Sequence, residues 1–256
     1  TYAARMVSEI ANQKPPGNAA YVGLSAFTHK AGVHVNAMMK DLRTYEHVAP
    51  ESVGNSRRYL ISDQAGASNV QDKAAKMGIK LDRKGPEVRK IVEQVHRMEA
   101  AGYQFEAAEG SFELLLKRAT GHDRRFFDVH GFHVTVEGGA QGKAVSEATV
   151  KVEVEGKQNH TVAEGIGPVD ALDRALRKAL DPFYPGLKEA HLSDFKVRIL
   201  DSREGSGAKV RVLVETRDRI CSWTTVGVSD NIIEASWEAL VDALEYKLLR
   251  DAGRKS

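Results

Sequence analysis

Two glycine-containing turns, each leading into a predicted helix, are the clearest candidates for chemistry in this 256-residue sequence. They read Gly165-Ile166-Gly167-Pro168 and Gly227-Val228-Ser229-Asp230. The first turn of a helix has free N–H groups and a partial positive charge, so each turn could hold a carboxylate. The same glycines could also serve only to make a tight strand-to-helix turn. Neither turn has the Lys-Ser/Thr ending of a P-loop or the spacing of a dinucleotide site, so phosphate binding is not expected.

The histidines and the cysteine do not form a pattern that indicates a metal or a nucleophile. His130 and His133 lie at the start of a predicted strand, where residues three apart point to opposite faces. We therefore expect no metal site in this chain. Cys221 precedes Trp223 in another predicted strand, and no His or Asp pattern frames it as a nucleophile. A single cysteine excludes an intramolecular disulfide and favours a reducing compartment.

The N-terminal half predicts helices and loops, without the alternation of a strand. We expect helices over residues 1–13, 62–77, 86–101 and 107–119, the third of them begun by Pro86 and ended by Gly102. The polar segment 23–36, which contains His29 and His34, is expected to be an irregular loop. Long irregular loops in compact proteins are often functional.

The C-terminal half contains an internal repeat. The strand pattern Phe132-His-Val134-Thr-Val136 recurs as Phe195-Lys-Val197-Arg-Ile199, and the strand starting at Ala148 recurs at Ala208. The helix positions also correspond, with Ala171, Ala175, Leu176, Ala179 and Leu180 matched by Ala235, Ala239, Leu240, Ala243 and Leu244. The sequence therefore predicts two βββα units whose sheet faces are buried against each other in a pseudo-twofold domain.

Composition excludes several classes of protein. The chain has 37 Lys and Arg against 35 Asp and Glu, a formal net charge of +2, so nothing favours a nucleic-acid partner. No apolar run approaches the ~18–20 residues of a membrane span, so we expect no membrane partner. The chain opens with TYAARMVSEIANQ, without Met and within a helical pattern, so we expect an excised fragment.

Six sequence blocks, in order along nearly the whole chain, carry a resemblance to a known family: GLSAFTHKAGVHVNAMMKD, TYEHVAPESVGNSRRYL, ISDQAGASN, YQFEAAEGSFELLLKRA, GPVDALDRALRKAL and VGVSDNIIEASWEALVDALEYKL. Together they resemble the C-terminal half of the 2-isopropylmalate synthase and (R)-citramalate synthase family. The blocks THKAGVHVNA, TYEH and VGN-x-RR are most similar to the citramalate synthase branch.

The resemblance implies an α+β architecture of three parts. A loop-rich linker subdomain I would occupy 1–54, a helical linker subdomain II 55–125, and the allosteric regulatory domain 126–256, with repeats at 126–185 and 192–250. The family's catalytic TIM barrel precedes this region and is expected to be absent. The barrel would hold the divalent metal, acetyl-CoA and the 2-oxo acid, so no cofactor is expected in this fragment.

The resemblance also implies the reaction. The acetyl methyl of acetyl-CoA loses a proton and attacks the carbonyl of pyruvate or 2-oxoisovalerate, and water then releases CoA. In the family, linker subdomain I reaches the neighbouring protomer's barrel. When the family's motifs are matched to this sequence, His34 would be the base or part of a proton relay and Tyr45 would orient the substrate. Asn36 would line the mouth of the same site. The parent would be a cytoplasmic homodimer, and this fragment alone is expected to be inactive.

The resemblance finally implies a feedback site for a branched-chain amino acid. Its residues would lie at the two helix starts and on the first strands of the second unit: Val169, Asp170, Ile199, Ser202, Ala208, Val210, Val228 and Asp230. Isoleucine would be the effector of a citramalate synthase and leucine that of an isopropylmalate synthase, and the residues do not decide between them. The alternative from another class is a free-standing amino-acid-binding regulatory module.

Overall fold

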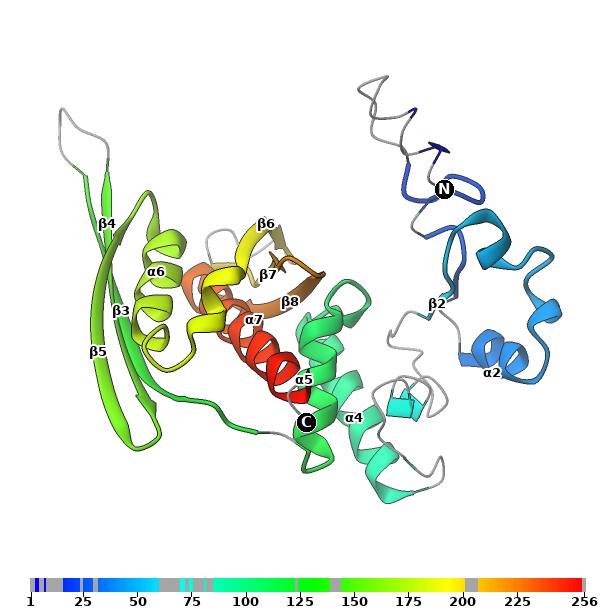
Figure 1. The fold of residues 1–256 in the computed structure, drawn as a ribbon, viewed down its shortest axis with the longest axis horizontal. Coiled ribbons are helices and arrows are strands. Elements are labelled where there is room, and N and C mark those ends of the chain that lie inside the picture. The colour runs from blue at the N-terminus through cyan, green and yellow to red at the C-terminus, as the bar shows by residue number, and fades with distance from the viewer. Residues whose placement is uncertain are drawn as a thin grey trace. The chain divides into compact units, whose positions relative to one another are not determined.

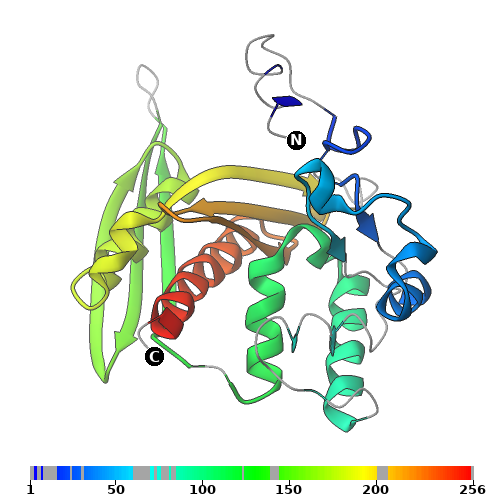
Figure 2. The same cartoon turned by 45° about the vertical axis from the view of Figure 1, so that its right-hand side comes forward.

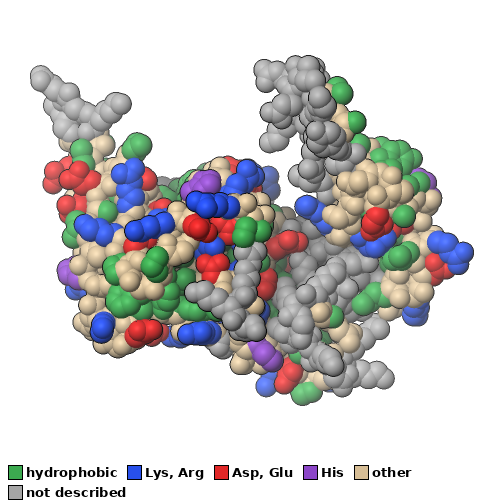
Figure 3. Space-filling view, viewed as in Figure 1, with side chains coloured by type: hydrophobic (Ala, Val, Ile, Leu, Met, Phe, Trp, Pro, Cys, Tyr) green, Lys and Arg blue, Asp and Glu red, His purple; other side chains and the backbone are tan. Residues whose placement is uncertain are grey.

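The chain forms two compact units, Thr1–Ala100 and Ala101–Ser256, and each is described by itself. The computed structural model describes residues 3–4, 7, 16–23, 25–29, 32–59, 70–71, 74–75, 81, 85–122, 124–138, 144–200 and 207–254 (Figures 1 and 2). Within these ranges, no helix combines the length and the apolar character needed to cross a membrane. On the face shown in Figure 3, cationic and anionic side chains are interspersed over the second unit.

The first unit is assembled from short elements and one long helix. Its described elements are β1 (Thr28–His29), α2 (Gly32–Lys40), the 3-10 turns η1 (Leu42–Thr44) and η2 (Pro50–Val53), β2 (Arg58–Tyr59) and α4 (Pro86–Ala101). β1 and β2 pair in parallel. α4 begins at Pro86 as the sequence predicts, and its apolar stripe buries Val88, Ile91 and Val95. The expected helices at 1–13 and 62–77 lie mostly outside the described residues, although residues 3–4, 7, 70–71 and 74–75 are helical.

Helix α2 corrects the expectation that segment 23–36 is an irregular loop. The nine residues from Gly32 to Lys40 are helical, and Met38 is almost completely buried while Val33 is exposed. The first turn has no acidic residue, and it begins with a glycine rather than with a good helix former. Local propensity therefore gives little signal here, and burial of one face stabilises the helix.

The second unit consists of two antiparallel three-stranded sheets and the helices that pack on them. In chain order its elements are η3 (Phe105–Ala107), α5 (Glu109–Ala119), β3 (Asp128–Glu137), β4 (Val145–Val154), β5 (Lys157–Gly165), α6 (Pro168–Leu180), η4 (Pro185–Glu189), β6 (His191–Ile199), β7 (Val210–Arg217), β8 (Ser222–Ser229) and α7 (Ile232–Arg254). The sheets have the orders β3-β4-β5 and β6-β7-β8. This confirms the predicted α+β class and the two βββα units.

The central strands show why the sequence alternates. Along β4, Ala148, Val150, Val152 and Val154 are completely buried, and the residues between them are partly or fully exposed. Successive side chains of a strand point to opposite faces, so every second residue faces the helices. The first sheet thus has one face in the core and one in solvent.

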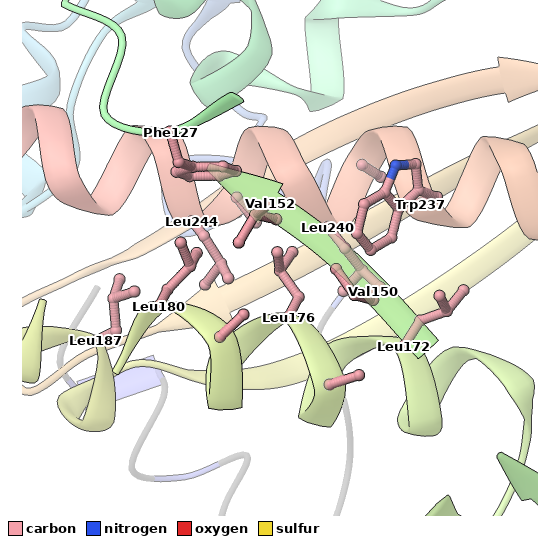
Figure 4. Packing of buried hydrophobic residues seen from close by; sticks show 14 of the residues in the cluster. Phe127, Val150, Val152, Leu172, Leu176, Leu180, Leu187, Trp237, Leu240 and Leu244 are labelled. Atoms are coloured by element: carbon pink, nitrogen blue, oxygen red, sulfur yellow. The ribbon is translucent and has the colours of Figure 1, made fainter. Parts of the chain in front are cut away.

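The two βββα halves of the second unit share one hydrophobic core. Figure 4 shows Leu172, Leu176 and Leu180 of α6 beside Leu240 and Leu244 of α7. Between the two halves, the ring of Phe132 in β3 lies 5.0 Å from that of Trp237 in α7. The helices contact each other and run in the same direction in Figure 4, so their N-terminal turns lie toward the same end.

A glycine brings each third strand against its helix. A Cβ on Gly165 would lie 2.3 Å from the backbone N of Ala171, and one on Gly227 would lie 2.0 Å from the carbonyl O of Ala235. The two turns differ in length. The helix residues Ala171 and Ala235 donate their N–H groups to Gly167 and Asn231, which stand two and four residues after the respective glycine. The second turn therefore has two additional residues.

Helix α5 covers the free edge of β8. The Ser111 hydroxyl accepts a hydrogen bond from Val226 N at 3.0 Å and donates one to Asp242 Oδ2 at 2.8 Å. A Cβ on Gly110 would lie 3.0 Å from the carbonyl O of Thr224, which shows how closely the helix approaches. The helix thus occupies the side of β8 on which another strand could otherwise pair.

The close approach of the two glycines predicts a stability effect. Gly165→Ala or Gly227→Ala forces backbone apart and should lower the free energy of unfolding by about 2–3 kcal/mol or more. Gly167→Ala is the matched control, since its φ is −154° and no atom lies within 4 Å of its ideal Cβ. It should change stability by less than about 1 kcal/mol. Urea unfolding followed by tryptophan fluorescence measures both, and equal effects would contradict this account.

Candidate functional site

The structure brings His34 and Tyr45 together. His34 lies in the first turn of α2, and Tyr45 ends η1 with its N–H bonded to the carbonyl of Leu42. The ring centroids are 4.3 Å apart, with an angle of 36° between the ring planes. Both side chains are exposed, 45% in the case of Tyr45. The pair therefore presents a proton-exchanging imidazole and a phenol hydroxyl at one place on the surface.

Asn36 does not share the face of α2 that His34 occupies. Each residue of an α-helix turns by about 100°, so Asn36 lies about 200° around the helix from His34. It is partly buried, whereas His34 is exposed. The helix geometry thus separates the third predicted catalytic residue from the His34–Tyr45 pair within this unit.

A buried carboxylate next to Tyr45 links three segments of the first unit. Glu46 Oε1 lies 3.0 Å from His29 Nε2 and 2.8 Å from Arg57 Nε, and Glu46 Oε2 accepts a second bond from Arg57 Nη2 at 2.5 Å. Its side chain is only 4% exposed. His29 is in β1, and Arg57 precedes β2. Glu46 therefore holds the segment that carries Tyr45 against the strand pair β1-β2. The chain continues from β1 into α2, which carries His34.

The charge state of Glu46 follows from its partners. Burial alone would raise the pKa of Glu46, but the hydrogen bonds and charges of Arg57 and His29 outweigh it and hold the pKa below its ordinary value. The carboxylate is ionised and fully used in these contacts. Among the described residues, no three His, Cys, Asp or Glu side chains converge as metal ligands.

The predicted effector residues of the second unit gather at one end of the sheet β6-β7-β8. Ile199 pairs with Val210, and Val210 pairs with Ser229. Val228 precedes Ser229 and pairs with Arg211, so its side chain points to the opposite face. Ile199 is 59% exposed, and Val210 and Val228 are partly buried. This end of the sheet offers accessible branched apolar side chains.

The remaining predicted effector residues have different surroundings. Ala208 is buried just before β7, and Asp230 is exposed just after β8. Ser202 lies outside the described residues. Val169 and Asp170 are partly buried in the first turn of α6. This turn and the first turn of α7 lie at the same end of the helix pair in Figure 4.

Asp170 already has partners in the structure. Its Oδ2 accepts a hydrogen bond from Ile166 N at 2.9 Å, and its Oδ1 accepts one from Arg174 Nε at 3.0 Å. Asp170 therefore holds the turn before α6 against the first turn of the helix, and its negative charge is suited to an ammonium group and not to a carboxylate. In the second βββα half, Glu234 accepts a bond from the Ser229 hydroxyl at 2.9 Å. Sequence reasoning missed Glu234, although it aligns with Asp170 once the longer turn is known.

Comparison with known proteins gives the family. Residues 106–248, more than half of the chain, match the LeuA allosteric (dimerisation) domain. The chain belongs to the 2-isopropylmalate and (R)-citramalate synthase family. Residues 21–102 match a second family, described as the homocitrate synthase post-HMGL domain-like family.

The relatives are synthases that are longer than this chain. The (R)-citramalate synthase of Geobacter sulfurreducens is 54% identical over 245 residues, which cover 95% of this chain and 46% of that protein. That of Aquifex aeolicus is 50% identical over 252 residues, 98% of this chain and 48% of that protein. A probable 2-isopropylmalate synthase of Methanopyrus kandleri is 28% identical over 246 residues, 93% of this chain and 46% of that protein. The chain thus spans about half the length of these relatives.

The Glu46 contacts predict a pH-dependent stability of the first unit. Glu46→Ala leaves the Arg57 guanidinium, 18% exposed, without its carboxylate and should cost about 3–5 kcal/mol. The folded pKa of Glu46 is lowered, so the wild-type contribution is present above pH ~4.5 and is lost as the pH falls through the folded value. Glu46→Ala should remove this acid-dependent part.

Hydrogen-exchange protection of residues 42–59, corrected for intrinsic rates at each pH, measures the effect. Asp41→Asn is the control, because Asp41 and Arg43 form an exposed pair that should contribute little. If Glu46→Ala left protection and its pH dependence unchanged, the structural role given to Glu46 would be wrong.

Proposed function

We propose that this chain is the linker and regulatory part of an acyltransferase that condenses acetyl-CoA with a 2-oxo acid in branched-chain amino-acid biosynthesis. The observation that carries the proposal is the 54% identity to an (R)-citramalate synthase over 95% of the chain. Pyruvate is the proposed 2-oxo acid and citramalate the product. The 28% identity to a probable 2-isopropylmalate synthase supports 2-oxoisovalerate as the second candidate.

His34 and Tyr45 are proposed to act at the active site of a partner subunit. The acetyl methyl must lose a proton before it attacks the 2-oxo carbonyl, and imidazole is the side chain best suited to exchange protons near neutral pH. The 4.3 Å ring contact supports a joint role, in which His34 takes or relays the proton and Tyr45 orients the substrate. Asn36 is proposed only to line the mouth of the site. A divalent metal held by a barrel domain would polarise the carbonyl.

The second unit is proposed to bind a branched-chain amino acid, isoleucine for a citramalate synthase and leucine for the second candidate. Ile199 and Val210, which are paired and share one face of the sheet, would contact the branched side chain, and Val228, whose side chain points to the opposite face, would border the site through its backbone. The N–H groups at a helix start would bind the carboxylate, and acidic groups such as Asp170 or Asp230 would bind the ammonium. The family's description as an allosteric and dimerisation domain supports a feedback role in a homodimer.

The proposed setting is the cytoplasm, with no nucleic-acid or membrane partner. The net charge of +2 and the interspersed charges in Figure 3 support the absence of a nucleic-acid partner. The alternative is a free-standing amino-acid-binding module, which would share the effector site but would have no use for His34 and Tyr45.

Titration calorimetry with isoleucine, leucine and valine tests the effector site. One of the three should bind this chain, and Val210→Ala should weaken that binding by about 5–30-fold, because it removes two methyl groups. Ile220→Ala is the matched control, since Ile220 is 64% exposed in the turn at the opposite end of the sheet. Absence of heat with all three amino acids, or equal affinity for both variants, would refute the assignment.

Kinetics of a full-length enzyme that contains this region test the catalytic residues. His34→Ala should lower kcat for CoA release by about 10²–10⁴-fold, because proton removal loses its positioned base. Tyr45→Phe should raise KM more than it lowers kcat. His130→Ala is the control, because His130 pairs with Glu153 on an exposed strand. This chain alone should release no CoA, and unchanged kcat in His34→Ala would remove His34 from the mechanism.

A further inference from the structure

The three residues that follow helix α4 are bound to the effector end of the second sheet. Arg211 of β7 donates from Nε to the carbonyl O of Gly102 at 2.6 Å and from Nη1 to Gln104 Oε1 at 2.7 Å. Arg211 is the Cα partner of Val228 and follows Val210 in the chain. The guanidinium thus connects the chain just after α4 to the strand that carries the proposed effector residues.

A single carboxylate makes the second connection. The Tyr103 hydroxyl donates to Glu238 Oε1 at 2.6 Å, and Glu238 Oε2 accepts a hydrogen bond from Val228 N at 3.1 Å. Burial is the main reason why the pKa values of Glu238 and Tyr103 are both raised, so each depends on its partner. The Val228 N–H, the Glu238 carboxylate and the Tyr103 hydroxyl thus form one continuous series of hydrogen bonds.

Direct packing makes the third connection. Gly102 has a φ of +116°, and a Cβ there would lie 2.3 Å from Leu200 Cδ1 and 3.3 Å from Val228 Cγ1. The backbone of Gly102 therefore lies directly on these two side chains. Of these two residues, Leu200 follows the proposed effector residue Ile199, and Val228 is itself a proposed effector residue. We call Gly102, Tyr103 and Gln104, with Arg211 and Glu238, the 102–104 clamp.

We propose that the 102–104 clamp couples effector binding to the chain that leaves α4, so that it is the first step by which the regulatory site acts on the rest of the protein. This proposal rests on the proposed effector site. Val228 belongs to both sets of contacts: it is a predicted effector residue, its N–H is held by Glu238, and its side chain touches Gly102.

The coupling has a required symmetry. If the effector binds more tightly when the clamp is closed, closing is favoured by the same factor when the effector is bound. Couplings of this kind change an equilibrium by about 5–150-fold. Ala101 is the last residue of α4, so a change in the clamp alters the chain path directly at the end of that helix. No transfer through distant side chains is needed for this first step.

Hydrogen exchange of this chain, with and without the amino acid that binds it, tests the proposal. In the wild type the ligand should slow exchange in peptides that cover 207–230 and, through the clamp, in the peptide that covers 98–105 by at least about fivefold. Arg211→Met keeps an unbranched aliphatic stem and removes the guanidinium. It should retain slowing at 207–230 and lose it at 98–105. Tyr103→Phe, which removes one hydroxyl, should give a partial loss.

The control is Arg217→Met on the same strand, where Arg217 is exposed and lies 3.9 Å from Glu215. It should behave as the wild type does. If Arg211→Met fails to fold, the result for Tyr103→Phe decides. Ligand slowing at 207–230 without slowing at 98–105 in the wild type overturns the clamp and leaves the effector site standing. Binding by none of the three branched-chain amino acids overturns both.

Discussion

Each three-stranded sheet of the second unit has an apolar face that a single helix cannot cover, and the rest of the domain is arranged around this constraint. Four residues of β4 are completely buried beneath α6, yet α6 has only 13 residues. The remaining cover comes from the other half, as the contact between Phe132 and Trp237 shows. The two βββα halves therefore bury their apolar residues in one shared core.

The longer helix α7 also makes polar contacts with α5, in addition to its apolar contacts in the shared core. It has 23 residues, and Glu238, Asp242 and Glu245 follow one another on it at intervals of four and three, which places them on one helix face. Burial raises the pKa of all three, and Arg118 is bonded to the last two. Polar partners with fixed directions hold α5 in one position, whereas apolar contacts alone would let it slide.

The sequence alone predicted the helices, strands and internal repeat that depend on local patterns of residues. Alternation predicted β4 and its buried face, Gly102 marked the end of α4, and the paired alanines revealed the two units. Helix α2 was missed, because its first turn lacks an acidic residue and its stability comes from the burial of Met38. The contacts of Arg211 with Gly102 and Gln104 join residues more than 100 positions apart, and no local pattern reports them. The nearness of His34 and Tyr45 followed only from the family resemblance, since the ten positions between them do not fix a ring contact.

The two additional residues in the turn after Gly227 break the internal symmetry at the place where each helix begins. A duplicated domain with identical halves would offer two equivalent receptors per chain. Here the first half has one residue, Ile166, between Gly165 and its helix cap, and the second half has Val228, Ser229 and Asp230 between Gly227 and Asn231. A small molecule that matched the backbone groups of one turn would therefore not match those of the other, so the two halves do not present equivalent surfaces at their helix starts.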